Sequence, residues 1–275
     1  MCLARIRAPS IAHLLDDMSG DKGIWYFAYG SNMRSSVMKR RGITALDAKL
    51  VVVPSHYLTF DIFGIPYAEP SFASIAAFVP EKVTILQTAS PARHTLVPAA
   101  HGVAYLLTPA DYRQLVISEG GGVAYNEIEV DAKILHLDDG GHEPTKLVAR
   151  TLQAKYPWEP NGSPSARYLG LLSEGCKEWK IPEDYCTYID SLPSYNPSRS
   201  VITRVGGMIF LSFWRPLLRA LVLLIKAKTD THGHCPRWLG WVIMTMYGLM
   251  WMCHDNIQSR VWGRGDGTKL NFLAV

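Results

Sequence analysis

The acidic residue most suited to take part in a reaction is Glu119, the last residue of a predicted helix, Thr108–Glu119. Thr108 can cap this helix and Pro109 suits its first turn. Glu119 follows Tyr112 by seven residues, which places both on one stripe of the helix with Leu115 and Val116. Because burying a carboxylate is costly without a partner or a chemical role, this position predicts a lone acid that exchanges a proton near neutral pH. The alternative is a terminal glutamate that points into water before Gly120-Gly121-Gly122.

A second candidate is the turn Tyr29-Gly30-Ser31-Asn32. A strand over Ile24–Tyr29 stops at Gly30, and a short helix over Met33–Arg41 begins after Ser31 or Asn32. Consecutive backbone N–H groups at such a junction can hold an anion or a polarised carbonyl, and a glycine lets the ligand approach closely. The alternative is an ordinary strand–turn–helix connection with an N-cap.

Other ionisable clusters carry weaker signals. Glu127, Glu129 and Asp131 alternate with apolar residues in the predicted strand 124–135, so we expect them on a solvated face. The sequences 232–235 (His-Gly-His-Cys) and 253–254 (Cys-His) fit no zinc spacing well, so we predict no metal site there.

The elements that must position these residues are mostly strands. We expect six strands and three or four interspersed helices, which predicts an α+β fold, a small mixed β-barrel with helices at its rim. The Pro/Gly segment 157–164 is typical of a loop that borders a site. The predicted strands are 24–29, 49–60, 72–79, 102–107, 124–135 and 145–153, and the further helices are 164–179 and 182–192.

Charge divides the 275-residue chain into unequal parts. Residues 1–198 contain 18 Lys and Arg against 21 Asp and Glu, whereas residues 199–275 contain ten against three. We therefore predict a lead-in over 1–22, a catalytic-type domain over 23–197 and an apolar, basic extension over 198–275. Basic residues within apolar runs favour an anionic surface such as a membrane and disfavour nucleic acid as a partner.

The extension has two apolar segments. The first, Val205–Ile225, could span a bilayer by length, but Arg215 and Arg219 make that costly. The second, Trp238–Cys253, is short for a span. The extension could lie at a membrane, cap the barrel or form a dimer interface, and the sequence leaves these readings open.

Cysteine usage and the N-terminus bear on the compartment. The five cysteines are scattered, and the first 17 residues lack the apolar run of a signal peptide. We therefore expect a reducing, cytoplasmic location, with membrane association through the extension as a further possibility.

Three segments together resemble one known family. They are Tyr26–Met33 (YFAYGSNM), His101–Tyr105 (HGVAY) followed by Ser118–Tyr125 (SEGGGVAY), and Pro164–Tyr168 (PSARY). Their order and spacing over residues 25–193 are similar to those of the γ-glutamyl cyclotransferases. The resemblance implies that Glu119 is the catalytic acid/base, that the turn Tyr29, Gly30, Ser31 and Asn32 binds the substrate, and that Tyr168 lines the pocket; Tyr168 could equally be a core residue.

The resemblance also implies an activity without metal or cofactor. The α-amine of a γ-glutamyl amide attacks its own γ-carbonyl and releases 5-oxoproline and an amine. The body and the extension look like the cyclotransferases of fungal gliotoxin-type (epidithiodiketopiperazine) biosynthesis, which implies glutathione-derived conjugates as the small-molecule substrate. For a bulky conjugate we expect a partly apolar pocket rimmed by Tyr67, Phe72 and Trp158.

Two alternatives remain open. One is a cyclotransferase for γ-glutamylamines. The other is a non-catalytic binding module of the same fold, anchored to a membrane through residues 199–275.

Overall fold

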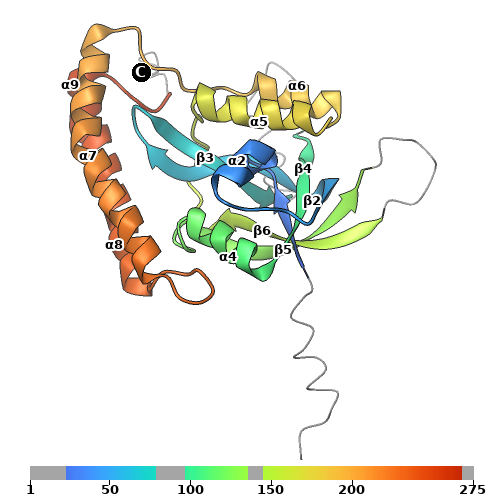
Figure 1. The fold of residues 1–275 in the computed structure, drawn as a ribbon. Coiled ribbons are helices and arrows are strands. Elements are labelled where there is room, and N and C mark those ends of the chain that lie inside the picture. The colour runs from blue at the N-terminus through green and yellow to red at the C-terminus, as the bar shows by residue number, and fades with distance from the viewer. Residues whose placement is uncertain (1–22, 79–96, 136–144, 268–275) are drawn as a thin grey trace, which may run out of the picture.

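Five of the described strands close into a barrel, and a sixth pairs with the part of one strand that extends beyond it (Figure 1). The computed structural model describes residues 23–78, 97–135 and 145–267. The sheet order is β3-β2-β4-β1-β6-β5, and pairing of β2 with β5 closes the ring. The bounds of the strands are β1 Ile24–Ala28, β2 Asp47–Ile65, β3 Glu69–Ala77, β4 Ala99–Leu107, β5 Tyr125–Ile134 and β6 Lys146–Ala154.

Closure depends on the long, bent strand β2. Its first half pairs with β4 and also contacts β5 through Val51 and Val52, while its second half pairs with β3. The register shifts between Val53 and Tyr57 and again between Thr59 and Ile62, and such irregularities bend a strand. One 19-residue strand therefore serves both the barrel and the hairpin that leaves it.

The central strand β1 runs antiparallel to β4 and parallel to β6, so the barrel is mixed. Tyr26 and Phe27 of β1, and Tyr29 directly after it, enter the main core, which fills the barrel and continues beneath the helices. After β1 come a 3₁₀ turn, η1 Ser31–Met33, and helix α2 Ser35–Arg40. The short helix predicted over Met33–Arg41 forms, but it begins two residues later, because Arg34 has an extended backbone and separates η1 from α2.

Three helices lie against the barrel. They are α4 Pro109–Ser118, α5 Ala166–Glu178 and α6 Glu183–Ser191. The predicted cap forms, because the Thr108 side chain accepts the Asp111 N–H at 3.1 Å; Ser165 caps α5 in the same way by accepting the Tyr168 N–H at 3.0 Å. The predicted α+β barrel with rim helices is confirmed.

The extension is a helical hairpin that packs on one side of the barrel (Figure 1). Helix α7 Val201–Lys228 runs along that side, α8 Arg237–Cys253 returns beside it, and a π-helical turn, η2 His254–Gln258, leads into α9 Ser259–Trp262. Of the readings left open by the sequence, the cap is the one that this fold contains.

Two apolar clusters fix this cap. In the first, Phe210, Trp214 and Leu218 of α7 and Met250 and Trp251 of α8 surround Tyr67, at the turn between β2 and β3. Trp251 also donates its Nε1–H to the Gly64 carbonyl at 3.0 Å. The second cluster joins Ile225, Leu239 and Ile243 to Val123, which follows Glu119 by four residues. The hairpin is therefore tied both to the β2–β3 turn and to the segment that carries the candidate acid.

Candidate active site

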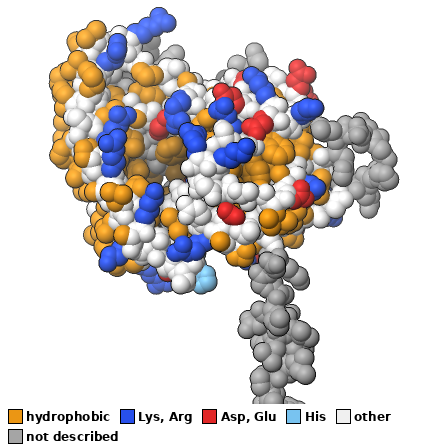
Figure 2. Space-filling model, in the orientation of Figure 1, with side chains coloured by type: hydrophobic (Ala, Val, Ile, Leu, Met, Phe, Trp, Pro, Cys, Tyr) orange, Lys and Arg blue, Asp and Glu red, His pale blue; other side chains and the backbone are white. Residues whose placement is uncertain are grey.

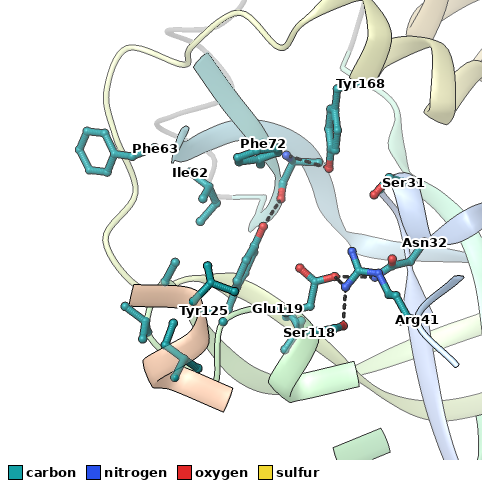
Figure 3. A pocket seen from close by; sticks show the side chains of 18 of the residues that line it. Ser31, Asn32, Arg41, Ile62, Phe63, Phe72, Ser118, Glu119, Tyr125 and Tyr168 are labelled. Carbon is teal, nitrogen blue, oxygen red and sulfur yellow. Dashed lines mark hydrogen bonds and ion pairs between the residues drawn. The ribbon is translucent and has the colours of Figure 1, made fainter. Parts of the chain in front are cut away.

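A pocket of about 540 Å³ opens between the mouth of the barrel and the helical cap. The polar lining comes from the barrel and its rim, whereas the apolar lining comes from the cap and from strands β2 and β3 (Figure 3). The polar lining includes Tyr26, Gly30, Ser31, Asn32, Arg41, Ser118, Glu119 and Tyr168. The apolar lining includes Ile62, Phe63, Phe72, Leu218, Leu221, Val222, Ile225, Ile243, Met244 and Tyr247.

Glu119 projects into the polar end of this pocket. It is the C-cap of α4, whose buried face of Tyr112, Leu115 and Val116 packs on the barrel. The Glu119 side chain is 19% exposed, and its Oε1 accepts a hydrogen bond from Asn32 Nδ2 at 2.9 Å. The structure thus brings the candidate acid to the candidate turn, 87 residues earlier in the chain.

Glu119 is not the lone acid that the sequence predicts. The Arg41 guanidinium lies 2.6 Å from Glu119 Oε1 and donates a 2.5 Å hydrogen bond to the Ser118 hydroxyl. Both partners of the ion pair are about four-fifths buried. The sequence does not single out Arg41, because a basic residue at the end of a short helix is ordinary and nothing in its spacing relates it to Glu119.

Asn32 links three parts of the site. Its Nδ2 group also donates to the Tyr26 hydroxyl at 3.1 Å, while its Oδ1 atom is buried without a hydrogen-bond partner in the described part of the chain. Burial and the negative charge of Glu119 raise the pKa of Tyr26 above its ordinary value. A buried, unpaired acceptor beside a carboxylate is suited to an N–H donor of a ligand.

Gly30 and Tyr168 meet closely across the pocket. A Cβ at Gly30 would lie 3.1 Å from the Tyr168 hydroxyl, which itself accepts the Ala73 N–H at 3.3 Å. Burial raises the pKa of Tyr168 to about 12, although the Ala73 hydrogen bond and contacts with Ser31 oppose the shift. Tyr168 packs in the main core and also lines the pocket, so the structure supports both descriptions of this residue.

Two further tyrosines, Tyr29 and Tyr125, line the pocket. The ring of Tyr29 lines the pocket, but its hydroxyl donates to the Leu152 carbonyl inside the barrel, so its polar atom is already bound. Tyr125, at the start of β5, was not singled out, yet it lines the pocket and donates to the Ala73 carbonyl at 3.2 Å (Figure 3).

Of the predicted pocket rim, only Phe72 lines the pocket. Tyr67 and Trp158 lie instead in the junction with the cap, where Trp158 stacks on Phe63 and contacts Trp251. The expectation for these two was wrong because their role depends on where α7 and α8 pack.

The glycine turn after Glu119 receives the loop between α7 and α8. Gly120, Gly121 and Gly122 all have positive φ, and the Gly121 carbonyl accepts the Cys235 N–H at 2.9 Å. A Cβ at Gly122 would lie 2.8 Å from the His234 ring. The glycines therefore allow both the reversal of the chain and the close approach of the cap.

The expectation that Glu127 is simply solvated is also wrong. Its side chain is 25% exposed, and it binds His234 Nε2 at 2.7 Å and the Tyr112 hydroxyl at 2.5 Å. His234 thus belongs to the contact between cap and barrel.

A second polar cluster lies at the end of the cap. His254, Asp255 and Asp266 are close enough to hold a metal ion. However, His254 Nε2 accepts the Gly265 N–H at 3.0 Å, and Arg264 contacts both carboxylates, at 2.5 Å from Asp266 and 3.0 Å from Asp255. The donors are occupied by protein groups, and a guanidinium between the two acids opposes a cation.

Comparisons with known proteins place these residues in a family context. The chain is 64% identical over 250 residues to "Gamma-glutamyl cyclotransferase gliK" of Aspergillus fumigatus, covering 91% of this chain and 92% of the relative. It is 36% identical to "Gamma-glutamyl cyclotransferase aclK" of Aspergillus oryzae, covering 90% and 91% of the two chains. This chain belongs to the γ-glutamyl cyclotransferase family. Residues 200–261 match the family model described as the AclK C-terminal domain, which corresponds to the cap.

A solved structure titled "Gamma-glutamyl cyclotransferase" is 18% identical to this chain, with a TM-score of 0.47 over 65% of this chain and 91% of that one. For a γ-glutamyl cyclotransferase, the pocket combines a carboxylate that can carry a proton, a turn with backbone and side-chain hydrogen-bonding groups, and an apolar wall supplied by the cap. This arrangement is suited to proton transfer beside a substrate with one polar and one apolar end.

Proposed function

We propose that this enzyme releases 5-oxoproline from γ-glutamyl amides, with Glu119 as its catalytic acid/base and Gly30, Ser31, Asn32 and Tyr168 as substrate-binding residues. The observation that carries the proposal is the hydrogen bond of 2.9 Å between Asn32 Nδ2 and Glu119 Oε1 within one pocket. It joins the two sequence motifs that the reaction needs in one place.

The reaction requires one proton to move between two nitrogen atoms. The α-amine of the substrate forms a bond to the γ-carbon, the bond from the γ-carbon to the amide nitrogen breaks, and a five-membered ring results. Glu119 accepts the proton from the attacking amine and returns it to the leaving nitrogen. The nucleophile is tethered to its target, so the enzyme's main task is to hold the folded conformer.

The residues around Glu119 can hold that conformer. The unpaired Asn32 Oδ1 is placed to accept an N–H of the attacking amine, and the backbone N–H groups of the 30–32 turn are suited to the glutamyl oxygens. Arg41 pairs with Glu119 in the carboxylate form, which is the form that can accept the proton.

The substrates we propose are glutathione-derived conjugates that carry a bulky apolar group, of the kind that arises in gliotoxin-type secondary metabolism. The apolar wall supports this choice, because Leu221, Ile243 and Tyr247 of the cap face the pocket opposite the polar end. A γ-glutamyl dipeptide would leave such a wall without a contact. We also propose a cytoplasmic location; the four described cysteines are free, as expected in a reducing compartment.

The central test uses mass spectrometry to measure the release of 5-oxoproline from glutathione S-conjugates by the wild type and by Glu119→Gln. Glutamine keeps the size of the side chain and an acceptor for Asn32 but cannot carry the proton. We expect kcat to fall by about 10²–10⁴-fold. Glu129→Gln, which changes an exposed carboxylate on β5, is the matched control and should retain full activity.

Product analysis separates the alternatives. Preference for a γ-glutamylamine over glutathione conjugates would replace the proposed substrate class while keeping the reaction. Equal turnover by the wild type and by Glu119→Gln would contradict the proposal that Glu119 is the catalytic acid/base. A folded wild type that turns over none of these substrates would favour the binding module.

A further inference from the structure

The surface of the cap that faces away from the barrel is unusually apolar for an exposed helical face. On α7, Ile202, Ile209, Phe213 and Leu223 share one stripe at helical spacing, and Phe213 is 61% exposed. On α8 the corresponding stripe contains Trp238, Trp241, Leu249 and Met252, with Trp241 71% exposed. We call these eight residues the outer face.

A row of basic residues borders the outer face. Arg204, Arg215, Arg219 and Lys226 follow one another along α7 at helical spacing, on the flank of its apolar stripe, and all four are exposed. Figure 2 shows Lys and Arg side chains beside the hydrophobic edge of the cap. Within the residues that the structure describes, none of the four has an acidic partner among the ion pairs, so their charge is available to an external anion.

Acidic residues contribute little to this surface. Between residues 201 and 262 the only acids are Asp230 and Asp255, and Asp255 is bound to Arg264 and His254. A second copy of the chain would bring the same basic row against itself, which is unfavourable. An anionic surface, in contrast, matches both the charge and the apolar stripe.

We propose that the outer face docks on the surface of an anionic phospholipid membrane, with α7 and α8 lying in the plane of the interface. The apolar stripe enters the boundary of the acyl chains, the tryptophan rings lie at the headgroup level, and the basic row contacts the lipid phosphates.

The contacts of the cap indicate that α7 lies on a membrane and does not cross it. Helix α7 is long and apolar enough to span one by length and composition, and 28% of its most apolar window is buried within the protein. However, Phe210, Trp214 and Leu218 pack against Tyr67, and Leu221 and Ile225 line the pocket. Crossing a bilayer would remove these contacts and would bury Arg215 and Arg219 in the acyl region.

Docking has a consequence for the pocket. The inner face of α7 forms part of its apolar wall, while the outer face of the same helix contacts lipid. A membrane-bound enzyme would therefore present the apolar end of its pocket beside the bilayer, where apolar conjugates concentrate.

Vesicle flotation of the full chain tests the proposal independently of catalysis. The probes are vesicles of phosphatidylcholine alone and vesicles in which a third of the lipid is phosphatidylserine. We expect the wild type to float with the anionic vesicles only and to be released by high salt. The triple variant Arg215→Gln, Arg219→Gln, Lys226→Gln should partition on the order of 100-fold more weakly.

Matched controls separate docking from folding and from net charge. The triple variant Lys39→Gln, Lys146→Gln, Lys177→Gln removes the same charge from exposed sites outside the cap and should bind as the wild type does. Phe213→Ser with Trp241→Ser should weaken binding without altering the release of 5-oxoproline, since neither residue lines the pocket.

Several outcomes would overturn the proposal. One is a wild type that does not bind anionic vesicles, and another is an equal loss of vesicle binding in the two triple variants. A third is protein that stays bound to vesicles at high salt, which would indicate a spanning helix. The outer face would be assigned to a second copy of the chain if the wild type did not bind lipid, formed a dimer in solution, and lost that dimer in the double variant Phe213→Ser, Trp241→Ser.

Discussion

At the scale of single residues, the ion pair between Arg41 and Glu119 determines how the Glu119 carboxylate is oriented in the pocket. It fixes the carboxylate between a guanidinium and the Asn32 amide, in a pocket where water has limited access. A bound substrate must share Glu119 with these two partners, so the orientation of the carboxylate depends on both.

Arg41→Gln tests this dependence. Without the guanidinium, Glu119 loses one of its two orienting contacts, and we expect kcat/KM to fall by about 10–100-fold because a small misplacement of a catalytic group is costly. Steady-state kinetics measure the effect. Lys39→Gln, which removes an exposed charge from the helix α2 that Arg41 caps, is the control. Unchanged kinetics in Arg41→Gln would contradict a positioning role.

Gly30 and Tyr168 offer a second test at this scale. Gly30 has φ of −110°, which alanine also adopts, so the obstacle to a side chain is the Tyr168 hydroxyl at 3.1 Å. We expect Gly30→Ala to reduce kcat/KM in the wild type and to have a smaller effect in Tyr168→Phe, which lacks the hydroxyl. The coupling between the two changes should be about 0.5–3 kcal/mol in a double-mutant cycle. Additive effects would show that the contact is unimportant.

At the scale of elements, α7 separates two environments. Its inner residues Leu218, Leu221 and Ile225 line the pocket, while its outer residues face away from the barrel. Much of the apolar wall is therefore built from an element that the barrel does not contain. We expect substrate choice to respond to changes in α7 separately from changes at Glu119.

Leu221→Ser tests the contribution of that wall. Loss of an apolar contact should lower kcat/KM for a glutathione conjugate with a bulky apolar group by about 10-fold or more. A small γ-glutamyl dipeptide should be affected little, because its leaving group does not reach the wall. Leu223→Ser, two residues away and 68% exposed, is the matched control when lipid is absent. Equal losses for both substrates would contradict a specific role in recognition.

At the scale of the whole molecule, His254 is a second histidine, besides His234, at the contact between the cap and the barrel. His254 is fully buried among the rings of Tyr67, Phe210 and Trp251. Because its Nε2 accepts the Gly265 N–H, its proton lies on Nδ1, which donates to Asp255 at 2.9 Å. Burial lowers the pKa of His254 below its ordinary value of 6.5, although the hydrogen bond to Asp255 opposes the shift.

The pH dependence of unfolding follows from this burial. The unfolded chain accepts a proton at His254 more readily than the folded chain, so the free energy of unfolding should decrease as pH falls from about 6.5 towards the lower pKa of the folded state. The contribution cannot exceed about 1.4 kcal/mol per pH unit for one histidine. Urea unfolding at several pH values measures the slope. In His254→Gln the slope of the unfolding free energy against pH should be smaller. The contributions of His56 and His101 to this slope should remain, because burial lowers their pKa values too. An unchanged slope in His254→Gln would contradict the assignment.

Local sequence signals explain how much of the fold was predictable. Apart from β2, which continues to Ile65, the described strands and the helices α4, α5 and α6 begin and end within a few residues of expectation. Alternating apolar residues, the Thr108 and Ser165 caps and glycine breaks act over short distances, which makes these bounds predictable. The bends of β2, which allow closure, carry no comparable signal in the sequence.

By itself, the sequence determined the family through three spaced motifs, the barrel through its strand pattern, and the choice of Glu119 and the 29–32 turn as candidates. Only the tertiary structure placed Arg41 beside Glu119, tied Glu127 to His234 and made the extension a wall of the pocket. Motifs and periodicity report short-range preferences along the chain. A contact between residues 41 and 119, or between 127 and 234, is decided by how distant elements pack. An apolar helix such as α7 could pack in several ways, and the barrel surface decides which of its faces is buried.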